Sequence, residues 1–194
     1  MCRFLLLLVA MLAGSHSVAG DIEEPAWQLV TQLDGVEIRQ YAPTIQARTP
    51  MTASEGSSSG FRRLAGYIFG GNDKEQSIAM TAPVEQTLQT DAPVMAFTLP
   101  AQYARDELPT PDDDSVSLVS VPQRTMAAIR FSGWATDSQV DARTDELLAV
   151  LAEHGVQHTG TPTLNQYNPP WTLPFLRRNE IMVEVLADSV EPGA

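Results

Sequence analysis

The order of regular segments constrains this chain most, because the same succession is predicted twice. Each half of the sequence has two extended segments, a stretch with helical spacing, and two further extended segments. The eight predicted strands are residues 27–33, 36–41, 77–88, 93–100, 116–122, 124–133, 161–167 and 179–186. The second strand continues as extended chain after Pro43 to residue 53. This duplicated strand-strand-helix-strand-strand unit predicts an α+β domain with a mostly antiparallel sheet, and leaves open whether the sheet forms a barrel or a saddle.

The two helices are predicted from apolar spacing and from end signals. In the first helix, the spacing i, i+3, i+4, i+7, i+8 is met by Phe61, Leu64, Ala65, Ile68 and Phe69. Gly70-Gly71-Asn72 ends this helix. Thr136 and Gln139 have the spacing of a capping box and open the second helix, which ends near Gly155.

The first twenty residues predict export. A single cation precedes an apolar run at residues 4–13, and Ser17-Val18-Ala19 fits a signal peptidase site. We expect residues 1–19 to be a cleaved signal peptide, and residues 20–194 to form a single domain in the periplasm or outside the cell. The apolar run is too short to span a bilayer, so we expect no membrane span.

Cysteine usage and motif content argue against most enzyme classes. Cys2 is the single cysteine and leaves with the signal peptide, which excludes disulfides, thiol catalysis and cysteine-based zinc sites. The sequence has no G-x-S-x-G motif, no H-E-x-x-H pair and no glycine-rich phosphate loop. His154 and His158 have the spacing of a metal-binding pair, but Gly155 ends the helix between them. We assign no catalytic residue and predict that the protein is not an enzyme.

The charge balance limits the partners. The chain has 24 acidic and 12 basic residues, a net charge of −12, which disfavours nucleic acids and anionic lipids. Asp112-Asp113-Asp114 lacks the alternating spacing of a calcium loop and is predicted to be a solvated connection. The arginine pairs Arg62-Arg63 and Arg177-Arg178 are either anion-binding sites or solvated surface. We expect a small-molecule partner and a monomeric protein.

Residues 168–178 form the most unusual loop. Three prolines exclude a regular helix or a central strand, yet Trp171 and Phe175 precede the cationic pair Arg177-Arg178. Phe61 and Leu64 likewise flank Arg62-Arg63. A ligand that matches both segments is large, flat and apolar with carboxylates at one edge, as a tetrapyrrole is. A fatty acid or a hydrophobic patch of a partner protein fits the same features, or the loop covers the sheet as a lid.

Glu180 is the most informative single carboxylate. It begins the last predicted strand, and if it points inward it needs a partner such as Arg177, Arg178 or a tyrosine. Two alternatives to tetrapyrrole binding use this residue. In the first alternative, Glu180 is the counter-charge for a cationic amphiphile. In the second, Glu180 and Tyr167 form the acid/base pair of a hydrolase.

Five strings carry a family resemblance. The chain resembles the SOUL haem-binding protein family over residues 36–185, through "VEIRQYAP", "GFRRLAGYIFGGND", "IAMTAPV", "RFSGWAT" and "YNPPWTLPFLRRNEIMVEV". The resemblance implies a distorted eight-stranded antiparallel β-barrel with two helices, built from a pseudo-twofold duplicated unit. This fold is similar to the effector-binding domains of certain multidrug-responsive bacterial regulators.

The resemblance also implies haem as the cofactor, in a shallow apolar groove between the first helix and the loop at 167–178. The residues expected to bind it are Phe61, Arg62, Arg63, Leu64, Ala65, Ile68, Met80, Trp171, Phe175, Arg177 and Arg178. This chain departs from its relatives at Gln40, which replaces a proposed iron-ligating histidine, and at Ser58 and Gly66, near positions of propionate-binding basic residues. No axial ligand is assigned; the residues with suitable side chains are Tyr41, Tyr67, Met80 and His158.

Overall fold

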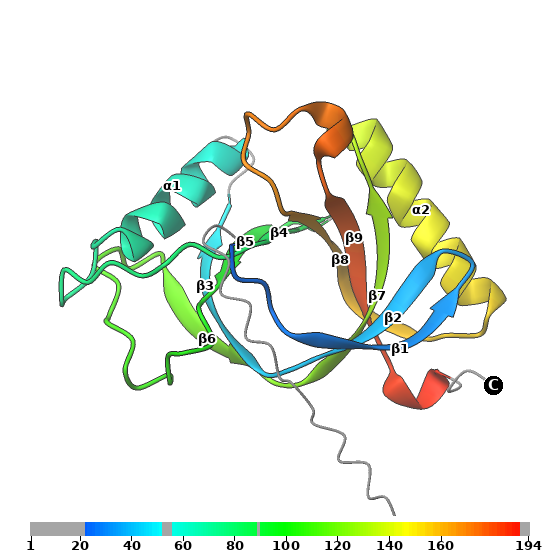
Figure 1. The fold of residues 1–194 in the computed structure, drawn as a ribbon, viewed down its shortest axis with the longest axis horizontal. Coiled ribbons are helices and arrows are strands. Elements are labelled where there is room, and N and C mark those ends of the chain that lie inside the picture. The colour runs from blue at the N-terminus through cyan, green and yellow to red at the C-terminus, as the bar shows by residue number, and fades with distance from the viewer. Residues whose placement is uncertain (1–21, 52–55, 89, 191–194) are drawn as a thin grey trace, which may run out of the picture.

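A computed structural model describes residues 22–51, 56–88 and 90–190 (Figure 1). The predicted signal peptide, residues 1–19, and the end of the extended stretch after Pro43 lie outside the described residues. The described chain has nine strands and two α-helices. Their bounds are β1 Trp27–Leu33, β2 Val36–Tyr41, β3 Thr44–Pro50, α1 Gly56–Ile68, β4 Val84–Thr87, β5 Val94–Thr98, β6 Ser117–Val121, β7 Arg124–Phe131, α2 Asp137–Glu153, β8 His158–Gln166 and β9 Asn179–Val185.

All nine strands belong to one antiparallel sheet, in the order β1-β2-β7-β9-β8-β4-β5-β3-β6. The sheet curls into a half-barrel (Figure 1). The predicted α+β class, antiparallel pairing and two helices are confirmed. The number of strands differs by one, because Pro43 separates β2 from β3. β2 pairs with β1 and β7, whereas β3 pairs with β5 and β6. The extended chain after Pro43 is therefore a separate strand, in the opposite half of the sheet from β2.

The predicted duplication is present, with a shifted boundary. The two units are β2-β3-α1-β4-β5 and β6-β7-α2-β8-β9. Exchanging the units reverses the order of these eight strands in the sheet, as a pseudo-twofold axis requires. β1 belongs to neither unit. It joins β2 through the turn at Asp34-Gly35, whose φ angles of 44° and 89° suit a tight hairpin turn.

Each helix covers one half of the sheet on the same face (Figure 1). α1 buries Leu64, Tyr67 and Ile68 against β3 and β5, in a core that includes Phe97. α2 begins at Thr136, whose hydroxyl accepts a hydrogen bond from the Gln139 amide at 3.4 Å, so the predicted helix start is confirmed. Its buried face packs on β7, β8 and β9 and contributes Leu147 and Leu151 to a second core. No described helix combines the length and apolarity needed to cross a membrane.

The opposite face of the sheet carries a row of polar side chains beside a small apolar cluster of Tyr41, Met126, Ala128 and Met182. Strand register places Arg130, Glu180, Asn165 and Glu85 in one row across β7, β9, β8 and β4. The row continues through Ala96 of β5 to Arg48 of β3. Charged side chains of this row that are buried need ion-pair or hydrogen-bond partners within the protein.

Candidate functional site

The loop at residues 167–178, here called the aromatic loop, arches between α1 and α2 in Figure 1. Its base is closed by two hydrogen bonds. The Tyr167 amide donates to the Arg178 carbonyl at 3.2 Å, and the Arg178 amide donates to Asn168 Oδ1 at 2.6 Å. A short 3-10 helix, η1 at Pro174–Leu176, forms its second half. The three prolines and these bonds hold the loop in one conformation.

Arg177 fixes the aromatic loop internally and to the rest of the protein. Its Nε donates to the Thr172 carbonyl at 2.9 Å, and its Nη2 donates to the Pro170 carbonyl. The guanidinium stacks on Trp134, 3.9 Å from the ring centroid, in the β7–α2 connection. The Gly133 amide in the same connection donates to the Pro174 carbonyl at 2.9 Å. Sequence reasoning did not identify Trp134, because Trp134 precedes α2 and Arg177 precedes β9, and no local pattern shows a contact between them.

The apolar side chains of the aromatic loop face solvent. Their exposed fractions are 83% for Trp171, 71% for Phe175, 61% for Leu176 and 55% for Leu173. A lid over the sheet would bury these groups, so the lid alternative is wrong. A rigid surface segment with this much exposed apolar area is typical of a binding surface.

The predicted groove face of α1 divides into a surface part and a core part. Phe61 is 42% exposed and packs edge-on against Phe97 with ring centroids 5.3 Å apart. Leu64 and Ile68 are almost completely buried in the core, so a ligand on the protein surface does not contact them. Ala65 is half-buried. The expected contacts of Leu64 and Ile68 with a ligand are therefore corrected to core packing, whereas Phe61 remains accessible.

The two arginines of α1 differ in the same way. The Nε of Arg63 donates to Thr49 Oγ1 at 2.9 Å, and its Nη2 donates to the Pro50 carbonyl, so this side chain is held against β3. Arg62 is exposed and has no ion-pair partner among the described residues. A shallow hollow of about 430 Å³ lies over this helix face. It is lined by Ser59, Arg62, Arg63, Gly66, Tyr67, Gly71, Asp112 and Asp113.

Below the aromatic loop lies a buried polar network centred on Glu180. Arg39 donates to both carboxylate oxygens, at 2.7 and 3.2 Å. Arg178 Nε donates to the carboxylate at 3.0 Å, and the Tyr167 hydroxyl donates at 2.8 Å. Arg178 also pairs with Glu24, at 2.9 Å. The predicted partners Arg178 and a tyrosine are confirmed, Arg177 is not a partner, and Arg39 is the partner that the sequence did not indicate.

The network fixes the protonation of its members. Burial alone would raise the pKa of Glu180, but the bonds and charges of Arg39 and Arg178 outweigh it and lower the pKa below its ordinary value. Burial and the adjacent Glu180 carboxylate raise the pKa of the Tyr167 hydroxyl. Glu180 is therefore ionised, completely buried and already neutralised by two cations. It is not the counter-charge for a cationic ligand, and that alternative is corrected.

A family model described as SOUL heme-binding protein matches residues 22–184. The chain belongs to this family. Heme-binding protein 1 of Xenopus laevis is 28% identical over 181 residues, which cover 86% of this chain and 94% of that protein. The family match over residues 22–184 spans the aromatic loop, the Glu180 network and both helices.

Solved structures share the SOUL fold at low identity. The C-terminal domain of EcmrR has a TM-score of 0.58 at 12% identity, covering 82% of this chain and 98% of that chain. A hydrolase from Listeria innocua has a TM-score of 0.57 at 11% identity, covering 78% of this chain and 92% of that chain. At such identities the likeness shows the fold alone.

For a SOUL protein, the possible iron ligands of this chain are poorly placed. Tyr41 is buried and its hydroxyl accepts a bond from Arg39. Tyr67 is buried and donates to the Pro109 carbonyl at 3.1 Å, and burial raises the pKa of its hydroxyl to about 12. Met80 is half-buried against the α1 core, and His158 begins β8. None of these four residues belongs to the aromatic loop, so the loop fits the apolar body of a porphyrin better than it fits its iron.

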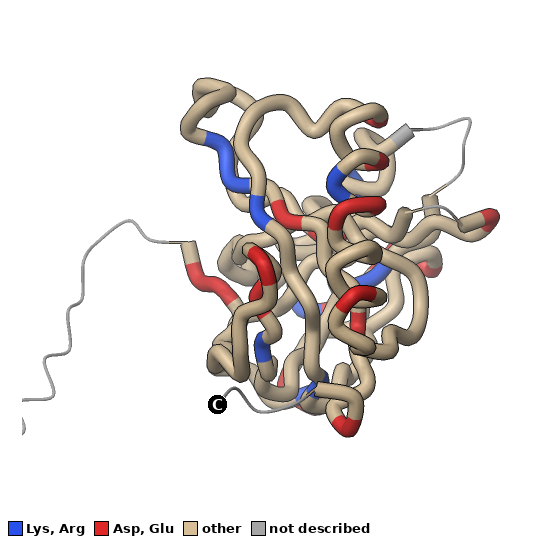
Figure 2. Tube along the Cα trace, turned by 90° about the vertical axis from the view of Figure 1, so that its right-hand side faces the viewer, with Lys and Arg blue, Asp and Glu red and all other residues tan. Residues whose placement is uncertain are grey.

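The described residues offer no other metal centre. They contain no group of three or more His, Cys, Asp or Glu side chains arranged to hold an ion. His154 is the C-cap residue of α2, and its Nε2 lies 2.8 Å from Asp34 Oδ2. His158 is the first residue of β8. The Asp112-Asp113-Asp114 run is exposed, and Asp113 accepts from the Ser115 amide and hydroxyl. Figure 2 shows acidic residues spread over the whole trace instead of gathered at one point.

Proposed function

We propose that this protein binds haem or a related tetrapyrrole in a shallow apolar groove between the aromatic loop and the exposed part of α1, without catalysing a reaction. Membership of a haem-binding family supports the ligand class. The feature that carries the proposal is the exposed, rigid apolar surface of the aromatic loop. Because the loop is already held by internal bonds, little conformational entropy is lost when a flat ligand packs on Trp171 and Phe175.

The hydrogen bonding of the four arginines supports a choice among the cations proposed to hold the ligand carboxylates. Arg178 and Arg63 are engaged by the Glu180 network and by β3. Arg177 bonds only to backbone carbonyls in the described part of the chain, so its Nη1 group can still donate to a carboxylate. Arg62 is exposed on α1. We propose that Arg177 and Arg62 pair with the carboxylates, and that Arg178 and Arg63 are positioning residues.

Haem supplies redox-active iron and a large planar apolar surface when it is bound. The residues of this chain fit the surface and the carboxylates, as described above. They provide contact through Trp171, Phe175 and Phe61, and charge through Arg177 and Arg62. We therefore expect the affinity to depend little on iron.

A hydrolase is the second candidate, since Tyr167 and Glu180 are in hydrogen-bond contact. Its weakness is the environment of the pair. Glu180 is fully buried and paired with two guanidinium groups, and the small cavity of about 20 Å³ beside Tyr167 has no room for a substrate. A general base must reach a proton of its substrate. We propose that the pair is structural.

We further propose that the protein acts in the periplasm or outside the cell, because residues 1–19 have the pattern of a signal peptide. Expression of the full chain in a bacterium, followed by the intact mass of the product in the periplasmic and cytoplasmic fractions, tests this. A periplasmic product lacking residues 1–19 supports export. An uncleaved cytoplasmic product contradicts it.

The binding proposal is tested by titrating the protein from Gly20 onward with hemin, following the Soret band and tryptophan quenching. We expect saturable one-to-one binding that weakens in Trp171→Ala and in Arg177→Ala. Arg143→Ala is the matched control, because Arg143 is a partly exposed arginine on α2 paired with Glu146. Equal affinity in all three variants would contradict the site. Non-saturable binding by the unmodified protein would contradict the function.

A further inference from the structure

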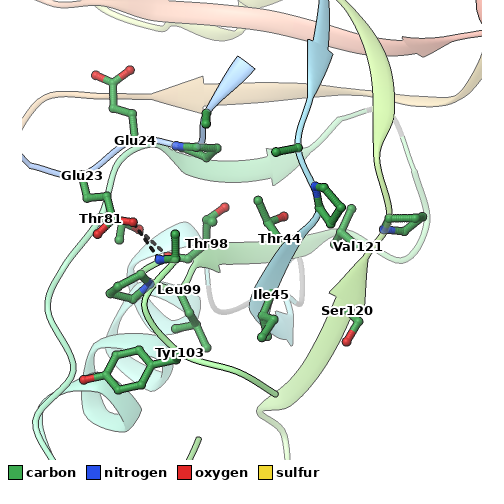
Figure 3. A pocket seen from close by; sticks show the side chains of 17 residues that line it. Glu23, Glu24, Thr44, Ile45, Thr81, Thr98, Leu99, Tyr103, Ser120 and Val121 are labelled. Atoms are coloured by element: carbon green, nitrogen blue, oxygen red, sulfur yellow. Dashed lines mark hydrogen bonds between the residues drawn. The ribbon is translucent and has the colours of Figure 1, made fainter. Parts of the chain in front are cut away.

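A cavity separate from the aromatic loop lies where β3, β5 and β6 meet the N-terminal segment, defined here as residues 22–26 (Figure 3). Its volume is about 630 Å³, within the range of roughly 300–1,000 Å³ usual for small-molecule sites. Its lining includes Glu23, Glu24, Thr44, Tyr103, Ser120 and Val121.

The N-terminal segment is fixed as one wall of this cavity. The Glu23 carbonyl accepts from the Ala82 amide at 2.9 Å, and the Ala26 carbonyl accepts from the Ala42 amide at 3.0 Å. The Glu23 side chain is held as well, because its Oε1 accepts from the Ala101 amide at 2.7 Å (Figure 3). The wall is therefore pre-formed at three points, and a ligand does not have to order it.

The lining is apolar and carries charge of one sign. Apart from two glutamates, it consists of proline, alanine, aliphatic residues, hydroxyl residues and Tyr103, and the described lining contains no Lys, Arg or His. Glu24 is already paired with Arg178. Glu23 is exposed and accepts one bond, and a carboxylate with two oxygens has further acceptor capacity. Glu23 is thus the charge that a ligand in the cavity meets.

We propose that this cavity binds an apolar molecule that carries one positive charge, with the body packed against β3 and β6 and the cation at Glu23. The net charge of −12 raises the local concentration of cations at the protein surface. An anion such as a tetrapyrrole carboxylate is repelled by Glu23 in this cavity. The cavity and the aromatic loop therefore select ligands of opposite charge. The proposal does not depend on haem binding.

The test uses two fluorescent dyes with the same benzophenoxazine body, cationic Nile blue and neutral Nile red. Fluorescence anisotropy gives the dissociation constant of each for the protein from Gly20 onward. We expect Nile blue to bind about tenfold more tightly than Nile red, because only the cation makes a charge-assisted bond to Glu23. Equal affinity for the two dyes would overturn the proposed charge selection.

Two variants locate the site. Glu23→Gln keeps an acceptor for the Ala101 amide and should weaken Nile blue about tenfold while leaving Nile red unchanged. Its control is Glu153→Gln on α2, which removes the same charge from another exposed position. Thr44→Phe places a ring in the cavity and should abolish binding of both dyes.

The aromatic loop provides the remaining control, because exposed aromatic side chains adsorb dyes. Trp171→Ala should leave Nile blue binding unchanged and weaken hemin. Loss of Nile blue binding in Trp171→Ala, or its retention in both Glu23→Gln and Thr44→Phe, would overturn the proposal. Circular dichroism checks whether Thr44→Phe folds. If Thr44→Phe does not fold, the affinity of Glu23→Gln for Nile blue decides whether the proposal holds.

Discussion

Arg39 and Glu180 are 141 residues apart in the sequence and form a buried bidentate ion pair, with Nη1 2.7 Å from Oε2. Arg39 lies on β2 in the first unit, and Glu180 is the second residue of β9 in the second. The pair therefore ties the two units together on the polar face of the sheet. Glu180 also binds Tyr167 and Arg178, the two residues that close the aromatic loop, so the same carboxylate connects the fold to the candidate site.

Removing the Glu180 charge should destabilise the fold. Glu180→Gln leaves Arg39 buried without its main counter-charge, which costs about 3 kcal/mol in the free energy of unfolding. Glu184→Gln is the matched control, because Glu184 lies on the same strand and the same face but is exposed. Urea unfolding of both variants measures the difference. A loss below about 1 kcal/mol in Glu180→Gln would contradict this, and would show that Glu37, 2.7 Å from Arg39 Nε, is a sufficient counter-charge.

Stability should fall in acid because of the same residue. The folded pKa of Glu180 lies below its ordinary value of 4.5, so the unfolded chain takes up a proton first as the pH falls. The contribution of Glu180 is complete above about pH 4.5 and is lost as the pH drops through the folded pKa. Urea unfolding at a series of pH values should therefore show the gap between the protein and Glu180→Gln narrowing in acid. A gap that is constant with pH would contradict an ionised Glu180.

The cap of α2 has a separate, smaller effect. Thr136→Ala removes the acceptor for the Gln139 amide and should lower the free energy of unfolding by about 1 kcal/mol. Thr136→Ser keeps the hydroxyl and should lose much less. Thermal unfolding followed by circular dichroism compares the two, and equal losses would indicate that packing of the threonine methyl group matters more than the cap.

Arg177 should act through geometry as well as charge. Arg177→Lys keeps the positive charge but loses the planar fork that bonds two carbonyls and stacks on Trp134. We expect its affinity for hemin to lie between those of the unmodified protein and Arg177→Ala. An affinity equal to that of the unmodified protein would mean that charge alone is sufficient. An affinity equal to that of Arg177→Ala would mean that charge contributes nothing.

The elements were predictable where the signal is local. Asp34-Gly35 identifies the β1–β2 hairpin, and Thr136 identifies the start of α2, because in both places the residue type itself satisfies the backbone. Strand pairing is not local. Pro43 marks a break, but only the sheet shows that β3 joins the other half of the molecule. The duplicated unit was therefore predicted with its first boundary one strand too early.

The candidate site was predictable in composition but not in detail. The prolines and aromatic residues of the aromatic loop indicated an exposed surface, and its side chains are exposed. The apolar stripe of α1 gave no means of separating Phe61 from Leu64, because helical spacing does not distinguish the edge of a buried face from its centre. Arg39 was missed because the partner of a buried carboxylate is set by strand register, here across β7.

The most direct test of the central claim compares the dissociation constants of hemin and metal-free protoporphyrin IX, for the unmodified protein and for Trp171→Ala. If the aromatic loop binds the porphyrin body, the two ligands should bind within about threefold of each other, and the loss of Trp171 should weaken both by about tenfold. Saturable binding of hemin without binding of the metal-free porphyrin, or equal affinity in Trp171→Ala, would contradict the account.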